Sequence, residues 1–275
     1  MIDAQDQIEY LKSFSYLISA YEEIAANRMQ KIRERVVYSR DYAGGLNNIF
    51  QQLKYSYKTK AEKYKKAALA NRNGKTACVF ISANSGLYGD LIHRIFHLFL
   101  EDWQREHGDA VVIGLWGKGL FENNTNHEPF TYFDFPDSSV DRDQLNKICD
   151  FLKPYQRVLV YHGLFRNIIR QDVAWSNISG DQLGPQVLLA EATRIIYEPS
   201  LEILLDFFEK EIFMTLFSQT VYESQLAKFS ARMTALDTAT QNIEKAAKIA
   251  TNNALAEKHR LINKKQQATM TGRLI

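Results

Sequence analysis

Glycine and proline are absent from both ends of this chain. The sequence has 275 residues with only 13 glycines and 5 prolines, and none of these lies between Met1 and Ala43. From Pro199 to Thr271 there is again no glycine, and Pro199 is the last proline. Glycine and proline cost about 1 and 3 kcal/mol in a helix interior. Their absence predicts two long, unbroken terminal helices with a compact domain between them.

Cysteine, long apolar runs and net charge are also scarce. The two cysteines, Cys78 and Cys149, are far apart and form no CxxC motif, which favours reduced thiols in a cytosolic protein over a disulfide scaffold. No apolar run reaches the roughly 18 residues of a membrane-spanning helix, and the opening MIDAQDQIEYLK does not resemble a signal peptide. The formal charge of +2 gives no argument for nucleic-acid binding. We expect a cytoplasmic protein that binds no nucleic acid and meets a membrane only through partner proteins.

Both terminal segments carry an apolar heptad pattern, in which steps of three and four residues alternate. In the N-terminal segment, with Arg28 as an interruption, the pattern comprises Leu11, Phe14, Ile18, Tyr21, Ala25 and Ile32. In the C-terminal segment it comprises Leu226, Phe229, Met233, Leu236, Thr240, Ile243, Ala247, Ala250 and Ala254. An apolar period of about 3.5 residues keeps one face of a helix towards a partner helix. The pattern predicts a protruding two-helix coiled coil, on the order of 100 Å long at about 1.5 Å per residue. Two long helices packed on their own domain are the alternative.

The middle of the chain alternates between strand and helix patterns. Short runs rich in strand-forming residues occur at 76–82, 110–115 and 157–161, with further candidates at 170–178 and 193–197. Between them, apolar residues recur at helical spacing in 86–107 and 141–152. This alternation implies right-handed crossovers and a largely parallel sheet covered by helices. We predict an α/β fold with a shaft helix at 1–60, a central Rossmann-like domain at 74–197 and a second shaft helix at 199–275.

The turn from Ser82 to Asp90 is the main candidate for chemistry in the middle domain. It follows the first predicted strand and precedes a helix, which is the setting in which backbone N–H groups bind phosphate. It has neither a GxGxxG nor a GxxxxGK[ST] pattern, so a Rossmann-like nucleotide-binding enzyme is the weaker interpretation. The stronger one is that Gly86 and Gly89 allow a sharp turn and close packing of the helix on the sheet.

No other group of residues assembles a catalytic or metal site in the sequence. His93 and His97 lie four residues apart on one predicted helix, but no third ligand or HExxH glutamate accompanies them. No nucleophile, base and orienting residue occur together. We expect no catalytic residue, no metal and no cofactor.

Motifs along the whole chain resemble those of the gamma subunit of F-type ATP synthases. Residues 25–29 (AANRM) look like that family's AASKM, and 82–89 (SANSGLYG) are similar to its S-x-D-R-G-L-C-G turn. Residues 113–119 (IGLWGKG) resemble its hydrophobic-G-x-K-G pattern, and 197–200 (YEPS) resemble its Y-E-P. Residues 231–242 (ARMTALDTATQN) resemble A-R-M-x-A-M followed by A-T-x-N. Each motif is weak alone, but together and in this order they indicate a member of this family.

The resemblance implies a mechanical function. The two terminal helices would form an antiparallel coiled coil, the axle inside a hexameric ring of alpha- and beta-like catalytic subunits. Rotation of this axle would be coupled to nucleotide turnover in the ring, and the chain itself would be non-catalytic. The central domain would form a foot that binds an epsilon-like subunit and a membrane rotor ring. The protein would then lie at the inner face of the cell membrane through its complex.

The same resemblance implies two sets of contact residues. In the foot, the turn would contribute Asn84, Ser85, Gly86, Tyr88 and Gly89. On the shaft, contacts with partner subunits would come from Tyr21, Glu22, Glu23, Arg28, Met29, Arg232, Met233, Leu236, Thr240 and Gln241.

The chain departs from the family pattern at several positions. Asn84 and Ser85 replace an aspartate and an arginine of the turn, and Phe229 replaces an acidic residue before the ARM motif. Glu22 and Glu23 lie where the family is usually methionine-rich or basic. These departures favour, as an alternative, the shaft of a specialised F-like ATPase that is not coupled to proton transport.

Overall fold

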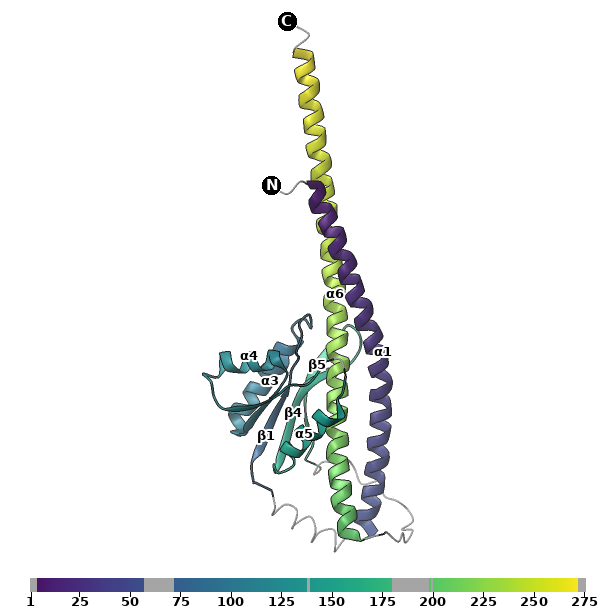
Figure 1. Ribbon diagram of the computed structural model, residues 1–275, viewed down its shortest axis with the longest axis vertical. Coiled ribbons are helices and arrows are strands. Elements are labelled where there is room, and N and C mark those ends of the chain that lie inside the picture. The colour runs from purple at the N-terminus through teal and green to yellow at the C-terminus, as the bar shows by residue number, and fades with distance from the viewer. Residues whose placement is uncertain (1–3, 57–71, 138, 180–197, 199, 272–275) are drawn as a thin grey trace.

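The computed structural model shows a long helical pair with a small α/β domain attached to its side (Figure 1). It describes residues 4–56, 72–137, 139–179, 198 and 200–271. Helix α1 (Ala4–Ser56) has 53 residues and helix α6 (Leu201–Thr271) has 71, which makes α6 about 105 Å long at about 1.5 Å per residue. The two helices run antiparallel and pack together, and α6 continues beyond the N-terminus of α1 (Figure 1). The predicted coiled coil of terminal helices is confirmed.

The buried face of α1 follows the heptad pattern, but with a phase that differs from the predicted one. Buried and half-buried positions are Leu11, Ser15, Ile18, Glu22, Ala25, Met29, Ile32 and Val36. Phe14 and Tyr21, which were predicted in this face, are 41% and 47% exposed, so their assignment to it is wrong. The physical reason lies further along the helix, where Ile32 and Val36 pack on Leu226 and Phe229 of α6. Counted back from that cluster, alternating steps of three and four residues place Ser15 and Glu22 on the face of α1 that packs against α6.

Two adjacent glycines, Gly44 and Gly45, lie inside α1 and do not end it. A Cβ at either position would meet no heavy atom within 4 Å, so packing does not require glycine there. Glycine weakens a helix by about 1 kcal/mol relative to alanine. Burial of the following turns compensates, because Leu46 and Phe50 are buried and the Phe50 ring stacks on Phe208 of α6 with centroids 6.0 Å apart.

The α/β domain, or foot domain, is built on one five-stranded sheet of order β3-β2-β1-β4-β5. Its strands are β1 (Thr76–Ile81), β2 (Asp109–Ile113), β3 (Phe130–Phe133), β4 (Arg157–Phe165) and β5 (Gln171–Asn177). The pairings among β3, β2, β1 and β4 are parallel, and β5 pairs antiparallel with β4. The prediction of a largely parallel, Rossmann-like sheet is confirmed. The candidate strand at 193–197 and the motif at Tyr197 lie outside the described residues.

Three helices cover the two faces of the sheet: α3 (Leu91–Glu106), α4 (Leu115–Asn124) and α5 (Arg142–Leu152). Odd-numbered residues of β1 belong to a core that includes α5 and residues Phe217 and Val221 of α6. Even-numbered residues of β1 belong to the opposite core, with α3 and with Ala227 and Ala231 of α6. Helix α6 therefore contributes to both cores of the foot domain as well as to the coiled coil.

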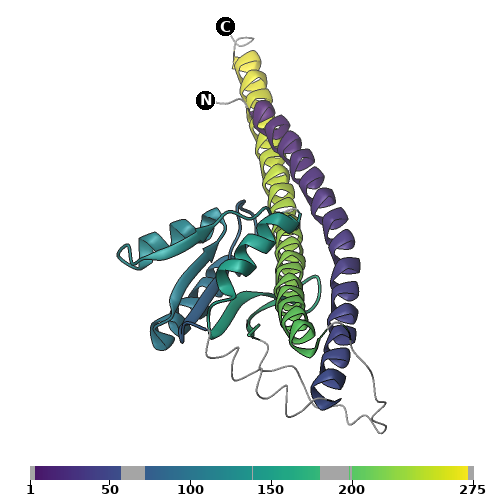
Figure 2. The same cartoon turned by 60° about the horizontal axis from the view of Figure 1, so that its bottom comes forward.

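Helix α6 lies between α1 and the foot domain in both views (Figure 1, Figure 2). Its contact with β4 depends on small residues. A Cβ on Gly163 of β4 would lie 3.0 Å from the Cβ of Ala227 and 3.3 Å from Leu91. Glycine at this position allows the shaft helix to approach the sheet closely, so the shaft and the foot form one packed body.

Two segments of the foot domain differ from the sequence prediction. The second predicted strand, 110–115, extends too far, because β2 ends at Ile113 and α4 begins at Leu115. Gly114 between them has φ of 101°, which favours glycine and ends the strand. The helix expected from Gly86 begins only at Leu91, because Leu87 and Gly89 have positive φ. Strand β3 was not predicted.

The corrected phase of α1 can be tested with a pair of alanine substitutions. Ile18→Ala removes a side chain that is 6% exposed in the coiled coil and should lower the free energy of unfolding by about 2 kcal/mol. Phe14→Ala removes an exposed ring and should change it by less than about 0.5 kcal/mol. Urea unfolding followed by far-ultraviolet circular dichroism measures both. A larger loss for Phe14→Ala than for Ile18→Ala would restore the originally predicted phase.

Candidate functional site

The Ser82–Asp90 turn leaves the C-terminal end of β1 and packs against the middle of α6. It contains Leu87 and Gly89, with φ of 69° and 57°. Left-handed backbone at these two positions lets the chain reverse before α3 begins. The turn, its contacts in the loop after β3 and the facing turn of α6 form what we call the turn–shaft junction, comprising Ser82, Asn84, Ser85, Gly86, Tyr88, Asp137, Lys228 and Arg232.

An ion pair between Lys228 of α6 and Asp137 of the loop after β3 lies at the centre of this junction. The two residues are 4% and 9% exposed, and Lys228 Nζ lies 2.8 Å from Asp137 Oδ1. The same ammonium donates to the backbone oxygen of Ser82 at 2.8 Å. Asp137 Oδ2 accepts hydrogen bonds from the backbone N–H groups of Asn84 and Ser85 at 2.8 and 2.9 Å, and from Ser85 Oγ at 2.9 Å. The shaft, the turn and the β3 loop thus meet at a single carboxylate.

The environment of Asp137 favours its ionised form. Burial on its own would raise the pKa of this carboxyl, but the charge and hydrogen bond of Lys228 oppose that effect, together with the hydrogen bonds from Ser85 and Asn84. The pKa of Asp137 is therefore held below its ordinary value. A fully paired and hydrogen-bonded carboxylate tolerates burial at this depth.

Arg232, one turn of α6 after Lys228, binds the other side of the turn. Its Nη2 donates to Ser85 Oγ and to the backbone oxygen of Gly86, both at 2.8 Å. Its guanidinium carbon lies 4.3 Å from the centroid of the Tyr88 ring, within the range of a cation–π contact. Because Ser85 donates its only hydroxyl proton to Asp137, Tyr88 must donate to Ser85 across their 3.0 Å contact. Burial, with a further contribution from the Asp137 charge, raises the pKa of Tyr88 to about 12, so this phenol keeps its proton.

The junction extends to α1 through Phe229. The guanidinium of Arg28 lies 5.7 Å from the centroid of this fully buried ring, and that of Arg232 lies 5.9 Å from it. Met29 packs against the same cluster. The predicted shaft residues Arg28, Met29 and Arg232 are therefore brought together with the predicted turn residues.

The geometry of the turn disfavours a phosphate site. Phosphate binding at a strand–turn–helix junction needs free backbone N–H groups. Those of Asn84 and Ser85 already donate to the carboxylate of Asp137. The Asn84 side chain is also engaged, since its Oδ1 accepts from the backbone of Leu115 and its Nδ2 donates to Asp134. The protein's own carboxylate occupies the position that a bound anion would need.

The remaining predicted shaft residues have different exposures. Tyr21, Glu23 and Gln241 are exposed, whereas Glu22, Met233 and Thr240 are half-buried. Leu236 is only 2% exposed, so this side chain is covered within the chain itself, and its contact with a partner subunit stays a prediction. Gly89 makes no contact that a Cβ would disturb, and its role is the left-handed turn.

Sequence reasoning missed the two residues at the centre of the junction, Lys228 and Asp137. Lys228 lies outside the family motifs recognised in the sequence, and no role was predicted for it. The signal that could have identified Lys228 is local. This residue directly precedes Phe229 and lies among small residues at heptad spacing, where a solvent-exposed lysine is not expected. No comparable signal precedes Asp137, because only the fold brings the β3 loop next to α6.

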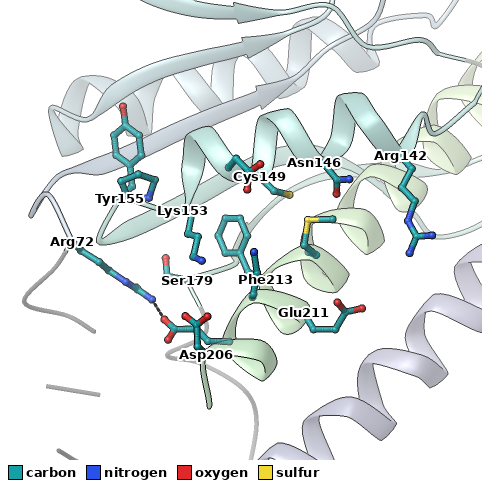
Figure 3. A pocket seen from close by; sticks show the side chains of 15 residues that line it. Arg72, Arg142, Asn146, Cys149, Lys153, Tyr155, Ser179, Asp206, Glu211 and Phe213 are labelled. Atoms are coloured by element: carbon teal, nitrogen blue, oxygen red, sulfur yellow. Dashed lines mark hydrogen bonds and ion pairs between the residues drawn. The ribbon is translucent and has the colours of Figure 1, made fainter. Parts of the chain in front are cut away.

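A large cavity of about 1030 Å³ lies elsewhere, between α5 and the first turns of α6 (Figure 3). Its wall carries similar numbers of acidic and basic side chains, and an ion pair between Arg72 and Glu209 crosses its edge. None of the predicted site residues lines it. Within the described ranges, no three histidine, cysteine, aspartate or glutamate side chains gather as a metal site, and no described helix is long and apolar enough to cross a bilayer.

Fold and junction together define a class of protein: a helical rod that is fixed at mid-length to an α/β foot. A family model described as ATP synthase matches residues 1–275, and the chain belongs to this ATP synthase family. It is 25% identical to the ATP synthase gamma chain of Pasteurella multocida, over 99% of this chain and 95% of that protein. It is 22% identical to the ATP synthase gamma chain of Methylobacillus flagellatus, over 98% of this chain and 94% of that protein.

Solved structures show the same fold. A chain of the Euglena gracilis mitochondrial ATP synthase superposes with a TM-score of 0.65 at 14% identity, covering 98% of this chain and 93% of that one. A chain of the Tetrahymena thermophila mitochondrial ATP synthase, from a structure of its central stalk and c-ring, gives a TM-score of 0.57 at 17% identity, covering 81% and 99%. The family inferred from the sequence motifs is confirmed.

Removal of the Lys228 charge should destabilise the whole protein. Lys228→Met leaves Asp137 buried without its counter-ion, which we expect to lower the free energy of unfolding by about 3–5 kcal/mol. Lys248→Met removes an exposed lysine of the same helix and should cost less than about 0.5 kcal/mol. Chemical denaturation of both variants measures the difference. Equal stabilities would mean that the buried pair is not formed in solution.

The pH dependence of stability should reveal the carboxylate of Asp137. Its folded pKa lies below the unfolded value of about 3.9, so its ionisation stabilises the fold at neutral pH. This contribution should be lost as pH falls through about 3.9 towards the folded pKa. We expect the difference in unfolding free energy between wild type and Asp137→Asn to shrink between about pH 6 and pH 3. A difference that stays constant or grows on acidification would show that Asp137 does not titrate in this way.

Proposed function

We propose that this chain is the central rotor shaft of an F-type or F-like ATPase. It couples its own rotation to nucleotide turnover in a surrounding hexamer of alpha- and beta-like subunits, and it catalyses nothing itself. The observation that carries the proposal is the attachment of a rod to a foot by a buried, charge-paired junction. A rotating shaft must transmit torque between its two ends, and a flexible linker between rod and foot would dissipate it.

The free end of α6 supports the same role. Beyond Ala254 every described side chain of α6 is exposed, and α1 does not accompany this part of the helix (Figure 1). An isolated helix of this length is marginal in water. Its side chains Leu255, Leu261, Ile262 and Met270 are apolar and exposed. This free end of α6 would gain stability if other subunits enclosed it, as they would inside a ring.

The foot is proposed to bind an epsilon-like subunit and a rotor ring, by analogy with the central stalk and c-ring named for the Tetrahymena structure. This arrangement places the protein at the inner face of the cell membrane through its complex. A non-catalytic role is supported by the turn–shaft junction, because the polar groups of the Ser82–Asp90 turn discussed above are engaged in contacts with the shaft, the β3 loop and α4.

The shaft of a specialised F-like ATPase, not coupled to proton transport, is a second candidate. The observation that favours it is the position of Ser85 and Phe229, two departures from the family pattern. Both contact Arg232 in the junction. The junction therefore contains side chains that differ from the family pattern, as expected if the foot binds a different partner. Co-purification of the complex with or without a membrane rotor ring distinguishes the two candidates.

Co-expression with the alpha- and beta-like subunits of the same organism tests the proposal. The full chain should co-purify with a nucleotide-binding hexamer. A variant that ends at Ala254 should still co-purify through the paired part of the shaft, but the complex should lose several-fold in ATP turnover. A matched control, Lys258→Ala with the full-length helix, should retain both properties. A chain that stays monomeric in the presence of these subunits would refute the rotor assignment.

A further inference from the structure

The side-chain amide of Gln225 lies on the part of α6 that packs against the foot domain. The residue is 2% exposed, and its Nε2 is fully covered and makes no hydrogen bond with any residue that the structure describes. A buried donor without an acceptor is destabilising, and such groups in native proteins are usually satisfied by a polar atom or by an ordered water molecule. The amide of Gln225 therefore indicates a small ligand that accepts a hydrogen bond.

A small cavity lies beside this amide, in the core that α5 and α6 form on one face of the sheet. Six apolar side chains, among them Ile81 and Phe217, form most of its wall, and the polar residues that line it are Ser82, Gln225 and Lys228. The volume that the centre of a water molecule can occupy there is about 10 Å³, which is room for about one water molecule. A cavity of this size binds water when two or more polar groups face it.

The ammonium of Lys228 supplies a second donor to the cavity. Lys228 follows Gln225 by three residues, so the two side chains lie on the same face of α6. An ammonium has three N–H donors, and two of those of Lys228 bind the backbone oxygen of Ser82 and Asp137 Oδ1, both at 2.8 Å. The third N–H has no acceptor among the described residues. An acceptor in the cavity would complete the hydrogen bonds of this buried charge.

Ser82 offers an acceptor from the foot domain. Its side chain faces the opposite core, where a Cβ on Gly117 would lie 2.6 Å from the Ser82 Cβ, so its backbone oxygen is the polar atom on the cavity side. This oxygen already accepts a hydrogen bond from Lys228. A carbonyl oxygen has two lone pairs, so it can accept a second hydrogen bond from a molecule in the cavity.

The chemistry of the cavity selects its occupant. A metal cation would face the N–H donors of Gln225 and Lys228, which repel it. An anion would add a buried net charge, because the charges of Lys228 and Asp137 already balance each other. A water molecule is neutral, fits the volume, accepts two hydrogen bonds and donates as well.

We propose that one water molecule binds in this cavity and links the shaft to the foot. It accepts hydrogen bonds from Gln225 Nε2 and Lys228 Nζ and donates one to the backbone oxygen of Ser82. Three hydrogen bonds are the usual number for a buried water. The water gives α6 and the turn a second polar link beside Asp137, and Gln225 is the residue that positions it. This inference goes beyond the rotor function proposed above and does not depend on it.

Oxygen-17 magnetic relaxation dispersion of the full chain tests the site, because it counts the water molecules that a protein retains in its interior. Gln225→Met keeps a side chain of similar size but removes the donor, and this variant should retain one internal water fewer than wild type. Ser224→Ala is the matched control, since Ser224 Oγ is also buried without a partner but does not line the cavity. Its count should equal that of wild type. An unchanged count in Gln225→Met, or the same loss in both variants, would overturn the inference.

A high-resolution crystal structure of the wild-type chain tests the site without any substitution. It should show the density of a single water within hydrogen-bond distance of Gln225 Nε2, Lys228 Nζ and the backbone oxygen of Ser82. A cavity without density, or density that refines as an ion, would refute the water site. Neither result would affect the rotor function, which co-purification with the catalytic subunits tests separately.

Discussion

The buried ion pair between Lys228 and Asp137 determines how the two parts of this protein are fixed to each other. A long helix has a repetitive surface and could slide or turn against a sheet at modest cost. Lys228 must reach both the carboxylate of Asp137 and the backbone of Ser82. A shift of α6 by one helical turn, about 5.4 Å, would leave a buried ammonium and a buried carboxylate without partners. The net gain in stability from such a pair is small, but the cost of the wrong arrangement is large, so the pair selects one register.

The rest of the architecture depends on that register. Phe217 and Val221 of α6 enter one core of the foot domain, and Ala227 and Ala231 enter the other. The same turns of α6 present Leu226 and Phe229 to α1. One helix therefore belongs to three packed surfaces at once. Rotation of the rod relative to the foot would disrupt all three surfaces. A shaft that bears torque requires such a rigid attachment, whereas an enzyme with a mobile active-site helix would not have it.

Much of the fold could be predicted from the sequence because it depends on local signals. The lack of helix breakers at both ends predicted α1 and α6, and apolar runs predicted β1, β2 and β4. Strand β3 was missed because it is an edge strand whose four residues are only half-buried, so no buried run marks it. Helix α4 was missed because Gly117 and Gly119 resemble helix breakers. Gly117 is required by packing, since a Cβ there would lie 2.6 Å from the side chain of Ser82.

The site was only partly predictable, for a different reason. The residues of the Ser82–Asp90 turn and Arg232 carry family motifs, and the fold brings them together. The ion pair joins residues 91 positions apart, and a single sequence contains no signal for such a contact. The phase of α1 was also ambiguous, because Phe14 and Tyr21 are more apolar than Ser15 and Glu22. Local hydrophobicity favoured the wrong face of α1, whereas the packing of Ile32 and Val36 on α6 determines which face is buried.

The central claim is that rod and foot turn as one body inside a ring of catalytic subunits. Observation of single complexes tests it most directly. Both native cysteines are buried, so a bead can be attached to the foot through Glu101→Cys on the exposed side of α3, with the ring fixed to a surface and ATP supplied. The account predicts unidirectional rotation of the foot in step with ATP hydrolysis. Hydrolysis that continues while the foot stays still or only fluctuates would contradict it.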